Sequence, residues 1–308
     1  MTEVSRTFTC FGGATTVAVE GTGPEGGAEQ AVQMAIDLLL DLHATFTRFK
    51  PESELSALNR DPAEQVAVSP VMARFVQAAV DAARRTGGLV DCTLLEVIEE
   101  AGYKQDRFKG TLALPLALAL APPRKPAAGS RSRWWEQVAV EHETCVVVRP
   151  PGLRFDGGGM VKGLAADIVA GRLADYDGFA VDCEGDIRVG GTQGEVRMLE
   201  VPNPFSGPVL HEFEVADGAL ATSSIVKRSW LQMMRPTHHL MDPSSRAPAF
   251  TGVVQVSALA PTAVEGEVLA KAALLSGPEG VERWLPHGGV AVYDDGSRKT
   301  VQASSGDG

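Results

Sequence analysis

The spacing of hydrophobic residues near the start of the chain predicts two helices and an opening strand pair. Over residues 32–42, apolar side chains recur at intervals of three and four, which predicts a helix of about five turns. A second helix is predicted to begin at Ser69-Pro70, a capping residue followed by proline, and to end at Gly87-Gly88. Residues 8–19 alternate between apolar and polar around Gly12-Gly13, a pattern typical of an opening strand or hairpin.

The rest of the chain mixes short strands with helices. Strands are predicted at residues 179–183 and 253–259, and helices at residues 163–176, 263–275 and 281–285. Hairpins are predicted over residues 138–148 and around the turn Asp294-Asp295-Gly296. Because there is no regular strand–helix–strand alternation, we expect an α+β fold with mixed, largely antiparallel sheets flanked by helices.

One segment departs from this pattern. Residues 115–133 are rich in alanine, proline, arginine and serine, and the stretch 112–133 is predicted to be an exposed, mobile connection. Such a connection interrupts a domain without separating two, so we expect residues 1–308 to form a single domain.

Composition and charge argue against several classes of protein. The 308 residues are 44% hydrophobic and 22% charged, as in ordinary globular domains. A formal net charge of −11 argues against a nucleic acid or an anionic membrane as the main partner. Residues 1–7 lack the apolar segment of a signal peptide, and no apolar stretch is long enough to cross a bilayer. The four cysteines lack C-x-x-C spacing, so we expect a reduced, cytoplasmic protein with no membrane insertion.

A run of three glycines, Gly157 to Gly159, carries the clearest chemical signal. It follows Asp156 and precedes Lys162, and a helix is predicted directly after it. Backbone N–H groups of a glycine-rich turn, a helix N-terminus and a nearby ammonium group together form a site for phosphate. The alternative interpretation is a surface turn in the left-handed backbone region with an exposed lysine. The spacing fits neither the P-loop of nucleotide hydrolases nor the Gly-x-Gly-x-x-Gly of dinucleotide folds.

Six segments, taken in order, resemble motifs of the FAD:protein FMN transferase family, also called ApbE-like. These segments are residues 48–59, 91–93, 156–167, 183–187, 221–223 and 239–243. The resemblance covers roughly residues 8–294, and the motifs occur in the order that the family has.

The resemblance implies an enzyme that cleaves the pyrophosphate of its substrate FAD. Such an enzyme attaches FMN by a phosphoester bond to a Thr or Ser of a partner protein and releases AMP. The expected partner is an FMN-accepting redox or membrane protein. Two alternatives stay open: a non-catalytic protein that binds or carries FAD or FMN, and an FAD pyrophosphatase that releases FMN and AMP.

The resemblance also implies roles for individual residues. His239 is the candidate general base, since an imidazole titrates near neutral pH, although a structural histidine at a strand end is the alternative. Lys162, Gly158 and Gly159 are suited to hold the pyrophosphate. The full set of expected flavin or phosphate contacts is Gly12, Val90, Asp91, Gly158, Gly159, Lys162, Gly185, Asp186, Thr222 and Ser223.

The expected magnesium site departs from the family pattern. The family binds the ion through a backbone carbonyl in the glycine turn, here that of Val161, and through Asp and Thr side chains, here Glu267 and Lys271. An ammonium group cannot ligate magnesium and repels it. One alternative is a surface ion pair between Glu267 and Lys271, which are spaced i, i+4. The other, which we expect, is that Lys271 points inward and takes over part of the charge of the ion, so that magnesium dependence is weak.

Overall fold

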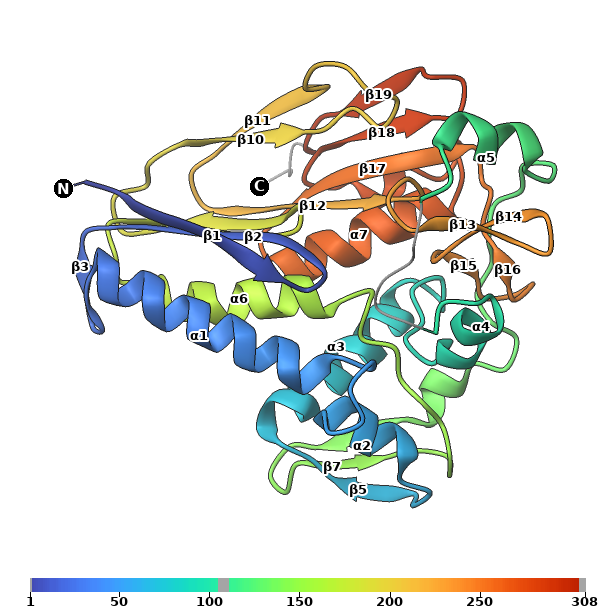
Figure 1. Ribbon diagram of the computed structural model, residues 1–308, viewed down its shortest axis with the longest axis horizontal. Helices are drawn as coiled ribbons and strands as arrows, with labels where there is room; N and C mark the ends of the chain where they lie inside the picture. Colours follow the sequence, from blue (N-terminus) through green and yellow to red (C-terminus); the bar gives the residue numbers. More distant parts are fainter. Residues whose placement is uncertain (1, 105–110, 305–308) are drawn as a thin grey trace.

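An antiparallel sheet forms the centre of the structure (Figure 1). The computed structural model describes residues 2–104 and 111–304, and within these ranges the sheet has eight strands. In spatial order the strands are β1 (Val4–Cys10), β2 (Gly13–Glu20), β8 (Gly178–Cys183), β9 (Asp186–Gly190), β12 (Gly218–Ser224), β17 (Val253–Ala260), β18 (Gly289–Tyr293) and β19 (Arg298–Val301). Every neighbouring pair is antiparallel, which confirms the predicted α+β class.

Three helices cover one face of this sheet: α1 (Ala28–Phe46), α6 (Val161–Leu173) and α7 (Ala263–Leu275) (Figure 1). Helix α7 packs on β12 and β17, α6 packs on β8, β9 and α7, and α1 packs on α6. The side chain of Asp167 in α6 fixes the start of α7, because it accepts hydrogen bonds from the N–H groups of Ala263 and Val264 at 2.8 and 2.9 Å. The N-terminal turns of α6 and α7 therefore lie together, and the candidate site is built around them.

Smaller elements complete the fold. On the other face of the central sheet, β10 (Arg197–Val201) and β11 (His211–Val215) pack over β9 and β12 through a small apolar cluster. A three-stranded sheet of β5 (Gln65–Ala67), β6 (Ala139–Glu141) and β7 (Val146–Val148) lies with α2 (Glu54–Arg60) and α3 (Pro70–Arg85) beyond α1 (Figure 1). The remaining elements are β3 (Thr22–Gly23), β4 (Gly26–Gly27), α4 (Leu95–Glu100), α5 (Leu114–Leu120), β13 (Ser229–Gln232), β14 (Arg235–His238), β15 (Met241–Asp242), β16 (Ala247–Pro248) and the 3₁₀ helices Trp134–Gln137 and Glu282–Trp284.

The segment 112–133 has more structure than a simple connection. Helix α5 lies within it, and the side chains of Leu114 and Ala117 are buried. Its backbone also pairs with distant segments, since Ala127 N–H donates to the carbonyl of Leu275 at 2.8 Å and Ser244 N–H donates to that of Ala128 at 3.0 Å. The composition from which the connection was predicted gave no sign of this helix, in which Pro115 occupies the first turn, where proline is tolerated.

Within the described ranges, every helix is too short or too polar to cross a membrane.

Candidate active site

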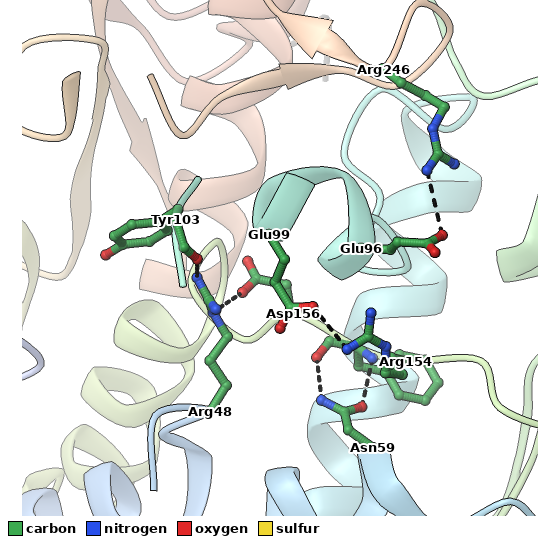
Figure 2. A network of polar contacts seen from close by, with 9 residues as sticks. Arg48, Asn59, Glu96, Glu99, Tyr103, Arg154, Asp156 and Arg246 are labelled. Carbon is green, nitrogen blue, oxygen red and sulfur yellow. Dashed lines mark hydrogen bonds and ion pairs between the residues drawn. The ribbon is translucent and has the colours of Figure 1, made fainter. Parts of the chain in front are cut away.

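The backbone leading into the glycine turn is held by neighbouring elements (Figure 2). The side-chain amide of Asn59, at the end of α2, pairs with both backbone groups of Phe155: it donates to the carbonyl at 2.8 Å and accepts from the N–H at 2.7 Å. The next N–H, that of Asp156, donates to the carbonyl of Cys92 at 2.8 Å. These three bonds fix the position of the turn before helix α6 begins.

Two of the three glycines allow close approach of other side chains, and the interpretation as a left-handed turn is wrong. Within the described residues, none of Gly157, Gly158 and Gly159 has a positive φ. A Cβ on Gly157 would lie 2.9 Å from Cγ2 of Val161, and one on Gly159 would overlap the ammonium of Lys271. The N–H groups of Gly158 and Gly159 find no acceptor among the described residues, so they can bind a ligand.

Two adjoining pockets open on this turn. The walls of the first include the expected site residues Val90, Asp91, Gly158, Gly159, His239 and Lys271. The walls of the second include Phe11, Phe46, Arg48, Phe49, Val161 and Lys162. Tyr103, Asp156, Gly158 and Arg228 line both pockets. A single extended ligand can therefore lie across the glycine turn with one part in each pocket.

His239 enters the first pocket directly after strand β14 and is half-buried. Its backbone N–H donates to the carbonyl of Arg228 at 3.2 Å, while its Nδ1 atom is buried and has no hydrogen-bond partner among the described residues. Burial lowers the pKa of His239 well below its usual value, and the positive charges of Arg228 and Lys271 lower it further. The imidazole is therefore neutral near pH 7 and is able to accept a proton.

The adjacent His238 has a different environment. It is fully buried, its Nδ1 accepts the N–H of Leu240 at 3.3 Å, and its ring contacts the edge of Phe250. Burial lowers the pKa of His238 to about 3. Because it lines neither pocket, its role is to pack the segment that carries His239.

Two buried carboxylates lie where α6 meets the sheet. Asp186 pairs with Lys162, with Oδ2 and Nζ 2.6 Å apart, and accepts the N–H of Thr222 at 3.2 Å. Glu267, on α7, accepts the N–H of Gly163 at 3.1 Å. Burial and then the charge of Asp186 raise the pKa of Glu267 to about 7. Burial alone would lower the pKa of Lys162, but Asp186 and Glu267 outweigh it and raise that pKa.

Lys271 points inward, as expected. Its Nζ donates to the carbonyl of Gly159, and its side chain lines the first pocket. The interpretation as a surface ion pair is wrong, because Glu267 is only 4% exposed and no ion pair between the two residues occurs in the described part of the chain.

The donor set does not fit a magnesium ion. Glu267 is protonated in part near neutral pH, Asp186 is paired with Lys162, and the ammonium of Lys271 occupies the glycine turn. A divalent ion about 4 Å from an ammonium group is repelled by about 8 kcal/mol at an effective dielectric constant near 20. Within the described residues, no group of three or more His, Cys, Asp or Glu side chains is arranged to hold a metal.

Besides Asp186, four expected flavin contacts line neither pocket: Gly12, Gly185, Thr222 and Ser223. Gly12 and Gly185 occupy tight turns, with φ of 88° and 96°, and Gly185 N–H donates to Asp182 at 2.7 Å. The hydroxyl of Thr222 pairs with that of Ser257 at 2.7 Å, joining β12 to β17. Asp186 also lies outside the pocket walls, but its pairing with Lys162 connects it to the second pocket.

Several pocket residues had not been selected from the sequence. Arg48 bridges Asp156, at 3.1 Å, and the carbonyl of Tyr103, at 2.7 Å (Figure 2). Arg228 pairs with Glu184 at 3.1 Å. Arg48 and Asp156 lie inside segments that resemble family motifs, so a charged side chain within such a segment could have marked them as site residues. Arg228 and Tyr103 lie outside every motif, and no sequence pattern marks them.

Comparisons with known proteins agree with this geometry. The ApbE family profile matches residues 11–293. A protein of Rhodobacter capsulatus named FAD:protein FMN transferase is 27% identical over 305 residues, which are 96% of this chain but 56% of that protein. A protein of Treponema pallidum with the same name is 25% identical, with 90% of this chain and 80% of that protein covered. The chain thus spans little more than half the length of the first relative.

Solved structures show the same fold. The crystal structure of the ApbE protein from Thermotoga maritima superposes with a TM-score of 0.80 at 21% identity, covering 97% of each chain. The flavin transferase ApbE from Vibrio cholerae superposes with a TM-score of 0.74 at 19% identity, covering 99% of this chain and 98% of that one. With the profile match extending over nearly all of the chain, the protein belongs to the ApbE family.

Proposed function

We propose that this protein is an FAD:protein FMN transferase. The observation that carries the proposal is the first pocket, where unpaired backbone N–H groups, an inward ammonium and a neutral imidazole lie together. Phosphoryl transfer requires neutralisation of phosphate charge, a positioned nucleophile and a base; this pocket offers groups for the first and the last, and the acceptor protein supplies the nucleophile.

In the proposed reaction, the N–H groups of Gly158 and Gly159 and the ammonium of Lys271 hold the diphosphate of FAD. The hydroxyl of a Thr or Ser on the acceptor protein attacks the phosphorus of the FMN half. Its proton passes to His239 as the new phosphoester bond forms, and the bond from that phosphorus to the bridging oxygen breaks. AMP leaves with that oxygen and its electron pair. The aromatic side chains of Phe11, Phe49 and Tyr103 give the second pocket walls suited to a planar ring of FAD.

FAD is expected to bind more tightly than FMN. The groups that converge on the glycine turn fit a diphosphate, and the second pocket holds a further part of an extended ligand. Because FMN lacks the second phosphate and the adenosine, it leaves these groups unused. Isothermal titration calorimetry with both flavins tests this, and equal affinities would contradict the assignment of the phosphate site.

The activity itself is tested by incubating the pure protein with FAD and candidate acceptor proteins. We expect AMP to be released in step with covalent flavin on the acceptor, seen as in-gel fluorescence. Release of AMP with free FMN and no labelled protein would indicate an FAD pyrophosphatase instead. Binding of FAD without any AMP would indicate a non-catalytic flavin-binding or carrier protein.

The proposal also covers the acceptor protein, the cellular compartment and the domain organisation. The acceptor is an FMN-accepting redox or membrane protein, and this chain works in the cytoplasm as one flavin transferase domain. Four free thiols, Cys10, Cys92, Cys145 and Cys183, support a reducing compartment. The backbone bonds of residues 125–128 to later segments support a single domain, because the segment 112–133 is then part of the same packed unit.

A further inference from the structure

Among the described residues, four cationic side chains line the two pockets, and one of them differs from the others. Three are paired with carboxylates at 2.6–3.1 Å: Arg48 with Asp156, Lys162 with Asp186, and Arg228 with Glu184. Lys271 has no carboxylate within ion-pair distance among the described residues, and its Nζ bonds the neutral carbonyl of Gly159. An ammonium group has three N–H donors, so two remain for an anionic ligand in the pocket.

The position of Lys271 directs those donors at the same place as the glycine turn. It is held on α7, a helix packed on β12 and β17, and its Nζ donates to the carbonyl of Gly159. The N–H groups of Gly158 and Gly159 come from the turn itself. Backbone donors and a fixed cation thus lie on the wall of one pocket, as in other phosphate sites.

We infer that Lys271 supplies, from within the chain, the positive charge that neutralises the diphosphate, so that FAD binds and is cleaved without a divalent metal ion. This rests on the proposed function in taking FAD as the ligand. The local geometry supports it: Asp186 is already paired with Lys162, and the ammonium of Lys271 lies against the carbonyl of Gly159 in the glycine turn. Once FAD is bound, its diphosphate adds negative charge beside an ammonium that has no carboxylate partner.

The test measures FAD binding as well as turnover, each in excess EDTA and in millimolar magnesium. For the wild-type protein we expect the dissociation constant, from quenching of flavin fluorescence, to agree within about twofold between the two conditions. Lys271→Thr should bind FAD at least about tenfold more weakly in EDTA, the usual loss for a charge-assisted hydrogen bond, and should regain affinity in magnesium. Lys271→Arg, which keeps the charge, should retain metal-independent binding. Lys299→Thr, the same change at an exposed lysine on β19, serves as the matched control.

The results separate this inference from the proposed function. Wild-type FAD binding or AMP release that is lost in EDTA and restored by magnesium would overturn the inference and leave the transferase assignment intact. Lys271→Thr binding FAD in EDTA as tightly as wild type would also overturn it. Metal-independent FAD binding that depends on Lys271, but without AMP release, would support the role of Lys271 in binding the diphosphate, and would contradict the proposed activity and with it metal-free cleavage. The wild-type comparison needs no variant, so the test does not depend on whether Lys271→Thr folds.

Discussion

His239→Ala is expected to lower the turnover of FAD by about 10²- to 10⁴-fold, the usual loss when a general base is removed. The affinity for FAD should change little, because the imidazole is neutral and contributes no charge to binding. The measurements are AMP release under saturating FAD and calorimetry of FAD binding. Added imidazole should restore part of the rate, since it can take the same proton in the space that the side chain leaves.

His287→Ala, the same change at an exposed histidine, is the matched control for this variant. If FAD affinity and thermal stability fall together with activity in His239→Ala, then His239 is structural and another group acts as the base.

The pH dependence gives a second readout for the same residue. Since burial and nearby positive charge hold the pKa of His239 well below 6.5, the free enzyme keeps the active, deprotonated form as the pH falls through 6.5. The kcat/KM profile reports the free enzyme, so it should show no loss of activity centred near that pH. Bound diphosphate favours the protonated form, so the profile of kcat should fall at a higher pH than that of kcat/KM. A kcat/KM profile that halves near pH 6.5 would contradict the burial of this imidazole.

Most of the fold could be predicted because local chemistry and tertiary packing agree. The helix start at Ser69-Pro70 is confirmed, since the Ser69 hydroxyl accepts the N–H of Met72 and Pro70 takes the first helical position. The predicted bounds of α7, residues 263–275, are those observed, because Thr262 caps one end of a long apolar run. Helix 163–176 was misplaced by two or three residues at each end, since α6 begins at Val161 and ends at Leu173. Nothing in the glycine-rich sequence marks Val161 as the first residue of this helix.

The candidate site could be predicted only in part, because its residues meet through tertiary contacts. Val90, Asp91, Gly158, Gly159 and His239 were selected from motifs and do line the first pocket. Thr222 and Ser223 were selected in the same way but line neither pocket. As neighbours on β12 their side chains point to opposite faces of the sheet, and the Thr222 hydroxyl pairs with that of Ser257 on β17. Arg228 was missed because a lone arginine in an irregular stretch has no periodic signature.

The sequence also could not predict which charged side chains pair with each other. Lys162 was expected to hold phosphate, and Asp186 to contact the flavin, yet the two pair with each other. Which carboxylate a lysine meets depends on the contact between α6 and β9, and residue spacing does not determine that contact. The inward direction of Lys271 was expected from the family resemblance alone, because the Thr at the aligned position faces the site; the i, i+4 spacing from Glu267 was equally compatible with a surface ion pair.

The contact between α6 and α7 leads to the last prediction, which concerns stability. A Cβ added to Gly163 would lie 2.7 Å from three backbone atoms: the carbonyl carbon and oxygen of Ala263 and the nitrogen of Val264. Backbone on a helix cannot move aside as a flexible side chain can, and α7 is fixed on the sheet behind it. Gly163→Ala should therefore lower the free energy of unfolding by about 2 kcal/mol or more, at the upper part of the range for overpacked cores.

Gly171→Ala is the matched control, because Gly171 lies in the same helix and a Cβ there would meet nothing within 4 Å. That variant should gain about 0.5–1 kcal/mol from the higher helix propensity of alanine. Urea unfolding of both variants, followed by circular dichroism, measures the difference. Gly163→Ala should also lose activity in native buffer, since any shift of α6 from α7 lengthens the bond from Gly163 N–H to Glu267 and moves the glycine turn relative to Lys271. Equal gains of stability in the two variants would mean that α6 and α7 are not in contact at Gly163. The placement of the candidate site where the N-terminal turns of the two helices meet would then be wrong.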